Sequence, residues 1–286
     1  MAVVDAQVHT WTPKDDPRYP WAADHPTSYF ETQVTPHAAE TVVADMDAAG
    51  VDAAITVVPR LYGWDNSYAL DAARRFPDRI GVVGRIDWHR PDHVGRLRTL
   101  MDQPGMLGIR VTTRNQPQTW EPGGELAGIL AAAEELDVPL SVSTGPESLG
   151  ALAGVASRHP DLRLLVDHLG MEAPPTTVPV PGPEPFKHLP QLLELAAYPN
   201  LYVKLTAAGA LSNEPFPFED IWPAVTAIVD AFGPGRVLWG TDYNRTKSLL
   251  SYDEAVHYLE AVGFDAGTLA QLYGGTLQKV FGWPAA

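Results

Sequence analysis

Three polar side chains stand where short apolar runs end, and their types suit attack on a carbonyl compound. His9, His168 and Asp242 each follow a run rich in Val, Ile and Leu. A carboxylate can take a proton from water, and imidazoles can stabilise the negative charge that develops on a carbonyl oxygen. A helix cap is the alternative interpretation of Asp242, but the next expected helix opens only near Ser251. We therefore predict that Asp242, His168 and His9 are catalytic.

Positive side chains recur at similar places along the chain. Arg60 follows the second apolar run, Arg85 and Arg110 end the third and fourth, and Lys204 lies in the seventh. A buried positive charge is costly unless it is paired, so some could pair with nearby aspartates. Arg110 is the preferred clamp for a substrate carboxylate. We expect Arg60 to bind substrate and Lys204 to act in catalysis, although both could equally be structural.

Aromatic residues are concentrated in the long segment after the first run, from Thr10 to Thr35. These aromatic side chains, with Trp11 first among them, suit a substrate that has an apolar or ring portion. They could equally serve only to fold the segment. We expect Trp11 and Tyr62 to contact substrate. A second long segment, Met171 to Phe186, is rich in proline and could be a surface excursion or a wall over the site.

The elements that must position these residues alternate regularly. Continuous apolar runs indicate parallel strands buried on both faces, and eight occur: Val3 to Val8, Ala53 to Val58, Ile80 to Ile86, Met106 to Val111, Leu140 to Ser143, Leu162 to Val166, Leu201 to Leu205 and Val237 to Trp239.

Helix-like segments separate these runs, and they carry recognisable start and stop signals. Apolar residues recur at helical spacing after Pro36 and end at Gly50. Ser251 and Glu254 have the spacing of a capping box. Further helices are predicted over Glu125 to Leu136, Glu147 to Arg158, Lys187 to Ala197, Glu219 to Phe232 and, as one extra C-terminal helix, Thr268 to Phe281.

Eight strand–helix units predict a single α/β domain over residues 1–286, a (β/α)8 TIM barrel whose strand ends share one mouth. The alternative is an open doubly wound sheet. That fold usually has a glycine-rich turn after its first strand, and Ala6 to Trp11 has none.

Composition excludes several classes of function. The net charge of −15 argues against a nucleic-acid partner and leaves a small-molecule substrate. The absence of cysteine excludes thiolate catalysis and cysteine-bound zinc. No continuous apolar stretch is long enough for a membrane helix, and the first residues do not resemble a secretory signal, so a cytoplasmic enzyme is expected. Neither a Gly-x-Ser-x-Gly elbow nor a phosphate-binding loop occurs. A homo-oligomer remains open.

The order of short motifs resembles the amidohydrolase-related (amidohydrolase 2) family, which contains sugar-acid lactonases and 2-pyrone-4,6-dicarboxylate lactonase. The motifs run through nearly the whole chain: Val4 to Trp11, Asn66 to Leu70, Gly108 to Arg110, Asp167 to Gly170, Val203 to Leu205 and Trp239 to Asp242. The resemblance implies an amidohydrolase-like barrel that opens a small lactone or cleaves an ester or amide. It also implies Asp242 as the base that activates water, with His9, His168 and Lys204 or an arginine polarising the carbonyl.

One position departs from the family pattern. The family has His-x-His at the end of strand one, but here Gln7 replaces the first histidine. An amide is a poorer zinc ligand than an imidazole, so we favour a metal-independent enzyme in which Gln7 contacts substrate. The alternative is one divalent metal such as zinc on His9, His168 and Asp242.

Two other functions compete with hydrolysis. The broader superfamily includes metal-dependent decarboxylases of small unsaturated or aromatic acids, so a lyase is the alternative enzyme. A non-catalytic barrel is the remaining possibility, which the retention of His9, His168 and Asp242 disfavours.

Overall fold

A computed structural model describes residues 2–23, 36–114, 116–171 and 185–284, apart from the side chain of Arg114. Its centre is one sheet of eight strands, each paired in parallel with the next along the chain. The strands are β1 (Val4–Val8), β2 (Ala53–Val57), β3 (Ile80–Gly84), β4 (Met106–Arg114), β5 (Leu140–Thr144), β6 (Leu164–Val166), β7 (Leu201–Thr206) and β8 (Val237–Gly240).

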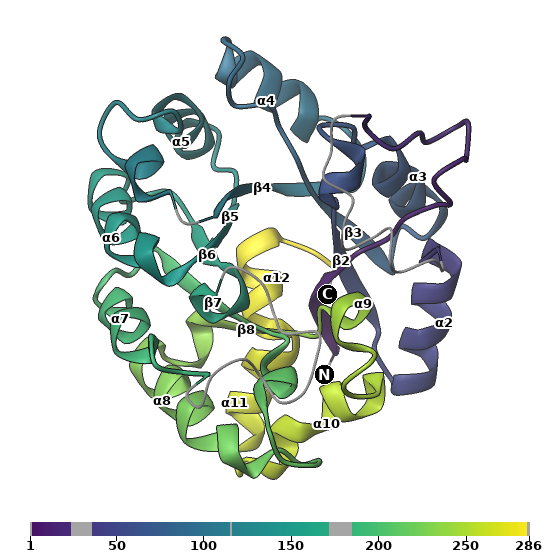
Figure 1. The fold of residues 1–286 in the computed structure, drawn as a ribbon, viewed down its shortest axis with the longest axis vertical. Helices are drawn as coiled ribbons and strands as arrows, with labels where there is room; N and C mark the ends of the chain where they lie inside the picture. Colours follow the sequence, from purple (N-terminus) through teal and green to yellow (C-terminus); the bar gives the residue numbers. More distant parts are fainter. Residues whose placement is uncertain (1, 24–35, 115, 172–184, 285–286) are drawn as a thin grey trace.

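The first and last strands lie side by side, so the sheet curls into a barrel. The main-chain N–H of Asp242, just after β8, donates to the carbonyl of Gln7 in β1 at 2.9 Å. Helices surround the strands (Figure 1). The predicted TIM barrel is confirmed, and each strand overlaps one of the predicted apolar runs. Helices cover the outer face of the strands, and side chains fill the inside of the barrel. Neither face of a strand meets solvent, which explains why the runs are continuously apolar.

Strand β4 is longer than the sequence predicted. Thr112 pairs with Ser143 and Arg114 with Thr144, so the β-branched residues after Val111 extend the ladder. Arg110 therefore lies inside β4, and the prediction that it ends the strand is wrong.

The helices occupy the predicted intervals with shifted ends. Gly50 adopts a left-handed conformation and ends the helix Ala39–Ala49. The Ser251–Glu254 capping box forms as predicted. The helices are α2 (Ala39–Ala49), α3 (Ser67–Arg75), α4 (His93–Met101), α5 (Ala127–Glu135), α6 (Leu149–Arg158), α7 (Leu189–Glu194), α8 (Trp222–Phe232), α9 (Tyr243–Thr246), α10 (Tyr252–Ala261), α11 (Ala266–Ala270) and α12 (Thr276–Phe281). Among these, none is long and apolar enough to cross a lipid bilayer.

The C-terminal segment closes the amino-terminal end of the barrel. The predicted single helix is instead α11, a π-helical turn (Gln271–Gly275) and α12. Leu277 and Val280 of α12 are buried with the interior residues of the strands. The rings of Phe281 and Trp283 pack against glycines near the starts of β4 and β3. The opposite end, where the strands finish, is left for a site.

Candidate functional site

A bulge in β1 aims two of the predicted site residues into the barrel. Val4 and Ala6 pack against the interior cluster, whereas Val8 packs outward against the helices. The pairing of β1 with β2 slips by one residue within the strand, so the alternation of faces changes there. Gln7 and His9 consequently point to the interior. Bulges commonly redirect a side chain beside an active site in this way.

His9 and Asp242 form a buried pair. His9 Nε2 lies 3.2 Å from Asp242 Oδ1, and His9 Nδ1 lies 2.6 Å from the carbonyl oxygen of Val57. The main-chain N–H of His9 donates to Asn244 Oδ1 at 2.5 Å. Since the carbonyl can only accept, Nδ1 carries a proton. The ring is thereby fixed from both sides.

Asp242 is wholly buried and has left-handed backbone geometry, with φ of 45°. Burial disfavours its charged form, but His9, His168 and Arg245 outweigh that effect and hold the pKa of Asp242 well below its usual range. Helix α9 begins at the next residue, so the expectation that no helix starts near Asp242 is wrong. Its side chain nevertheless makes no capping hydrogen bond.

His168 is held as a neutral imidazole. Its Nε2 faces two donors, Gln7 Nε2 at 3.1 Å and an Arg110 guanidinium nitrogen at 3.2 Å, and must accept from them. Its Nδ1 then carries the proton and donates to Thr206 Oγ1 at 3.0 Å. Burial lowers the pKa of His168 to about 3, which agrees with the neutral form. Nε2 also lies 3.9 Å from Asp242 Oδ2.

Asp167 joins two of the predicted cations. Its Oδ1 lies 2.9 Å from Lys204 Nζ, and its Oδ2 lies 2.8 Å from Arg110 Nε. Burial favours the neutral acid, but Lys204 and Arg110 outweigh it, so the pKa of Asp167 is below its ordinary value. Burial in turn lowers the pKa of Lys204, which Asp167 opposes. Two cations and one anion leave one net positive charge beside His168.

Gln7 connects the two halves of this cluster. Its Oε1 accepts from Lys204 Nζ at 2.6 Å, and its Nε2 donates to His168. The structure thus brings together Gln7, His9, Arg110, His168, Lys204 and Asp242. Sequence reasoning gave no role to Thr206, and it considered Asp167 only as a partner for a cation. Their places at the ends of β7 and β6 were the available signal.

The surroundings of His168 do not fit a divalent metal. The Nε2 lone pair that a metal would need already accepts from two N–H donors. An ion there would also lie near the Arg110 guanidinium and the Lys204 ammonium, which repel it. In the chain outside residues 1, 24–35, 115, 172–184 and 285–286, no three His, Asp or Glu side chains are grouped as metal ligands.

The other predicted substrate contacts fall in two places: Trp11 pairs with His37, and Arg60 and Tyr62 line a cavity. Trp11 is 1% exposed, and its main chain exchanges two hydrogen bonds with His37. Arg60 and Tyr62 line a cavity of about 560 Å³ together with Arg85. The Tyr62 hydroxyl accepts from the main-chain N–H of Thr12 at 2.8 Å. Two parts of the predicted long segments lie outside the described residues: 24–35 of the aromatic segment and 172–184 of the proline-rich segment.

Comparison with known sequences gives one family. A family model described as Amidohydrolase matches residues 4–283. The chain is 30% identical to a 4-sulfomuconolactone hydrolase from Hydrogenophaga intermedia over 71% of its length and 64% of that protein's. It is 31% identical to an L-fucono-1,5-lactonase from Burkholderia ambifaria over 63% of its length and 60% of that protein's. The chain thus spans less than two thirds of these curated relatives.

Solved structures share the fold over almost the whole chain. A Burkholderia multivorans amidohydrolase with bound zinc has a TM-score of 0.81 and 22% identity, covering 99% of this chain and 100% of that one. A putative 2-pyrone-4,6-dicarboxylic acid hydrolase from Pseudomonas putida has a TM-score of 0.78 and 19% identity, covering 100% and 99%. The 5-carboxyvanillate decarboxylase of Sphingomonas paucimobilis has a TM-score of 0.66 and 13% identity, covering 98% of each chain.

Proposed function

The chain belongs to the amidohydrolase family, and from this premise we propose that it hydrolyses a small lactone by water attack without a metal ion. The observation that carries the proposal is the convergence of the His9–Asp242 pair and neutral His168 beside the net positive charge of Lys204, Arg110 and Asp167. The names of the curated relatives, both lactone hydrolases, agree with this substrate class.

Asp242 acts as the base in this proposal. Its Oδ1 is occupied by His9, which leaves Oδ2 to receive a proton from water. The water oxygen bonds to the lactone carbonyl carbon as that proton moves to Asp242. Breakdown of the tetrahedral intermediate breaks the ring C–O bond. The same proton then passes to the departing alkoxide, which gives a hydroxy acid.

Lys204 and Arg110 stabilise the oxyanion that forms during attack. Both are buried and both are held by Asp167, so they need little reorganisation as the charge develops. His168 and Gln7 keep these donors in position by hydrogen bonding. A polar group fixed in a site that excludes water stabilises charge more than it would in solvent.

The donors around His168 support catalysis without a metal ion. Arg110 and Gln7 engage the nitrogen that would bind an ion, and Lys204 supplies positive charge beside it. The zinc-bound relative of the same fold makes zinc the alternative cofactor. The decarboxylase of the same fold keeps a lyase as the alternative reaction. The family resemblance implies that such a decarboxylation depends on a metal ion, which these donors disfavour.

The test is turnover of a lactone panel, measured by acid release with and without a chelator. We expect chelator-insensitive hydrolysis by the wild type and a loss of at least about 1,000-fold in Asp242→Asn, because the base is removed. Near-native far-UV circular dichroism of the variant serves as the control for folding. Activity restored only by added zinc would contradict the metal-free mechanism, and wild-type-like turnover by Asp242→Asn would contradict the assigned base.

A further inference from the structure

Arg85 is a buried cation, and no acidic side chain among the described residues balances its charge. It follows β3 and is 5% exposed. Its Nε donates to the carbonyl of Gly63 at 2.8 Å, and its guanidinium lies 4.9 Å from the ring centroid of Trp64. No carboxylate in the described part of the chain lies within ion-pair distance of Arg85, in contrast to Lys204 and Arg110, which share Asp167.

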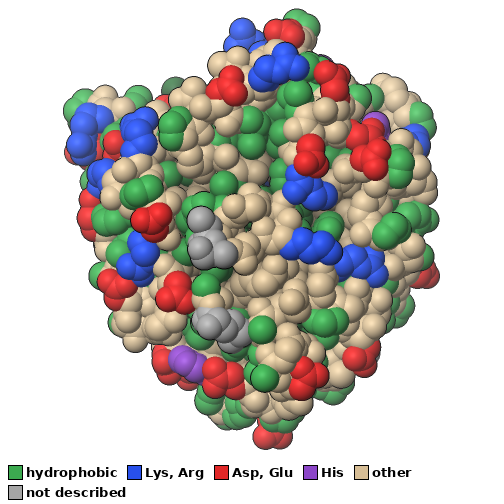
Figure 2. All heavy atoms as spheres, turned by 180° about the vertical axis from the view of Figure 1, so that it is seen from behind, with side chains coloured by type: hydrophobic (Ala, Val, Ile, Leu, Met, Phe, Trp, Pro, Cys, Tyr) green, Lys and Arg blue, Asp and Glu red, His purple; other side chains and the backbone are tan. Residues whose placement is uncertain are grey.

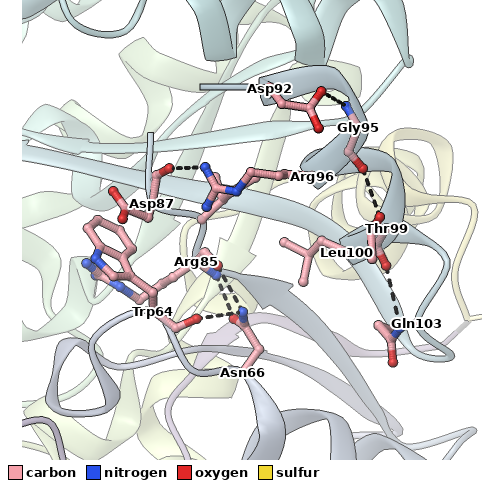
Figure 3. A pocket seen from close by; sticks show the side chains of 11 residues that line it. Trp64, Asn66, Arg85, Asp87, Asp92, Gly95, Arg96, Thr99, Leu100 and Gln103 are labelled. Atoms are coloured by element: carbon pink, nitrogen blue, oxygen red, sulfur yellow. Dashed lines mark hydrogen bonds between the residues drawn. The ribbon is translucent and has the colours of Figure 1, made fainter. Parts of the chain in front are cut away.

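The position of Arg85 is fixed by its own main chain. The Asn66 side chain accepts from the Arg85 N–H at 2.7 Å and donates to its carbonyl at 2.9 Å. Figure 3 shows these two bonds, with Trp64 beside the guanidinium. Such anchoring preorganises the arginine and lowers the entropic cost of binding a ligand.

The surroundings of Arg85 disfavour its positive charge. Burial, and after it the nearby cations Arg110 and Arg60, lower the pKa of Arg85 to about 9. The group is still a cation at neutral pH. A buried charge of this kind is costly unless an opposite charge is brought to it, and an anionic ligand is one that can supply it.

Arg85 faces a cavity of suitable size. The cavity has a volume of about 560 Å³, and Arg60, Trp88 and Thr112 also line it. Ligand pockets usually have about 300–1,000 Å³. The edge-to-face pair of Trp64 and Trp88, with ring centroids 4.9 Å apart, provides an apolar wall. Among the described residues that line this cavity, Asp65 is the one acidic residue, and its carboxylate already accepts from the main-chain N–H and hydroxyl of Ser67.

A second hollow has a volume of about 580 Å³, and Figure 3 shows the residues that line it. Trp64 and Arg85 line both, so they form the partition between them. The second hollow extends along α4, away from the strand ends. The first cavity includes Thr112 of β4. Thr112 lies two residues after Arg110, so both side chains are on the inner face of the barrel. The first is therefore the one next to the reactive cluster.

We propose that Arg85, together with Arg60, binds an anionic substituent of the substrate, a carboxylate or a sulfonate carried on the lactone away from the bond that breaks. This inference rests on the proposed lactonase function and specifies its substrate class. The Trp64–Trp88 wall receives the apolar part next to that substituent. Arg110 stays with Asp167 and His168 at the reacting carbonyl.

The test compares two substrates in one variant. Arg85→Gln removes the charge and keeps the main-chain bonds to Asn66. We expect kcat/KM for a carboxylate-bearing lactone to fall by about 30-fold or more, while kcat/KM for its methyl ester changes less than about threefold. The ratio of the two values does not depend on how much of the variant is folded. Arg85→Lys should restore part of the ratio.

The matched control is Arg98→Gln, which removes the same charge from an exposed position on α4. It should leave the ratio unchanged. An equal loss on both lactones in Arg85→Gln, no loss, or the same ratio change in Arg98→Gln would overturn the proposal.

A binding experiment separates this inference from the proposed function. Isophthalate carries two carboxylates on a ring and has no ester to cleave. Calorimetric titration should detect isophthalate binding to the wild type and to Arg98→Gln, and at least tenfold weaker binding to Arg85→Gln. This result would support the anion site even if no lactone were hydrolysed. Equal binding to Arg85→Gln, or no binding to the wild type, would refute it.

Discussion

At the scale of single residues, the tautomer of His168 determines what the cluster can do. Two donors point at Nε2, so the proton must reside on Nδ1, and the Thr206 hydroxyl is the group that accepts it. Thr206 also accepts from the main-chain N–H of His168 at 2.9 Å. A single hydroxyl thus sets both the orientation and the protonation of a side chain at the proposed site.

Replacing Thr206 by valine tests this role with almost no change in shape. Leaving a buried hydrogen-bonding group unsatisfied costs about 1–3 kcal/mol, so we expect kcat to fall by about 10-fold to 100-fold. KM should change little, because Thr206 lies behind the imidazole. Steady-state kinetics measure both. A change in KM alone would contradict the assignment, and Thr206→Ser, which keeps the hydroxyl, should retain most of the activity.

The sequence predicted which residues would come together in the cluster but not all of their partners. His9, His168, Lys204 and Asp242 could be singled out because barrel strand ends share one mouth. The joint use of Asp167 by Lys204 and Arg110 was not visible, since pairing depends on distances across the barrel. The helix that starts directly after Asp242 was also missed, because four residues give too short a pattern.

At the scale of elements, β1 is connected to its neighbours by a buried acid. Asp5 accepts from the main-chain N–H and hydroxyl of Thr241 at 2.9 and 2.5 Å and from the Tyr252 hydroxyl at 2.9 Å. Its Oδ1 also accepts from the Gln7 N–H, within the bulge. One carboxyl group therefore joins β1, the end of β8 and α10. A sequence pattern of period two cannot reveal the bulge, because one inserted residue reverses the faces after it.

This acid should give the fold a measurable pH dependence. Burial raises the pKa of Asp5 to about 6 from 3.8. The folded chain therefore holds the proton more tightly than the unfolded chain. The stabilisation is full below about pH 4 and is lost as the pH rises through 6. Relative to wild type, Asp5→Asn should gain about 3 kcal/mol of unfolding free energy between pH 4 and pH 7.

Urea denaturation at several pH values measures this difference. The exposed Asp102→Asn serves as the control and should keep a constant difference from wild type. A difference for Asp5→Asn that does not change with pH would show that Asp5 has the same proton affinity in both states.

At the scale of the whole molecule, the two ends of the barrel carry different elements. Helix α12 covers the amino-terminal end, and the reactive cluster lies at the other. On the face seen in Figure 2, basic side chains occur in small groups with acidic ones around them and form no continuous basic tract. The eight-strand architecture followed from the apolar runs, whereas the division of the C-terminal segment at the π-helical turn did not. Its helical spacing continues through residues 271–275, where only the hydrogen-bond pattern changes.

Leu277→Ala should separate stability from activity. This side chain is 1% exposed beneath the strands, so its truncation leaves a cavity. We expect a loss of about 2–5 kcal/mol in unfolding free energy. We also expect kcat/KM within about twofold of wild type at a temperature where the variant is folded. Chemical denaturation and kinetics on one preparation test both. A large fall in kcat/KM with the fold intact would indicate that the two ends are coupled.

The circular order of the strands has a consequence for how such a chain can diversify. The cluster residues lie in or directly after β1, β4, β6, β7 and β8, whereas Arg60 and Arg85 follow β2 and β3. If Arg60 and Arg85 bind substrate as proposed, mutations confined to the two connections after β2 and β3 would change substrate preference and leave the proposed catalytic cluster unaltered. A duplicated gene could in this way acquire a new substrate through a few changes in two short stretches of sequence.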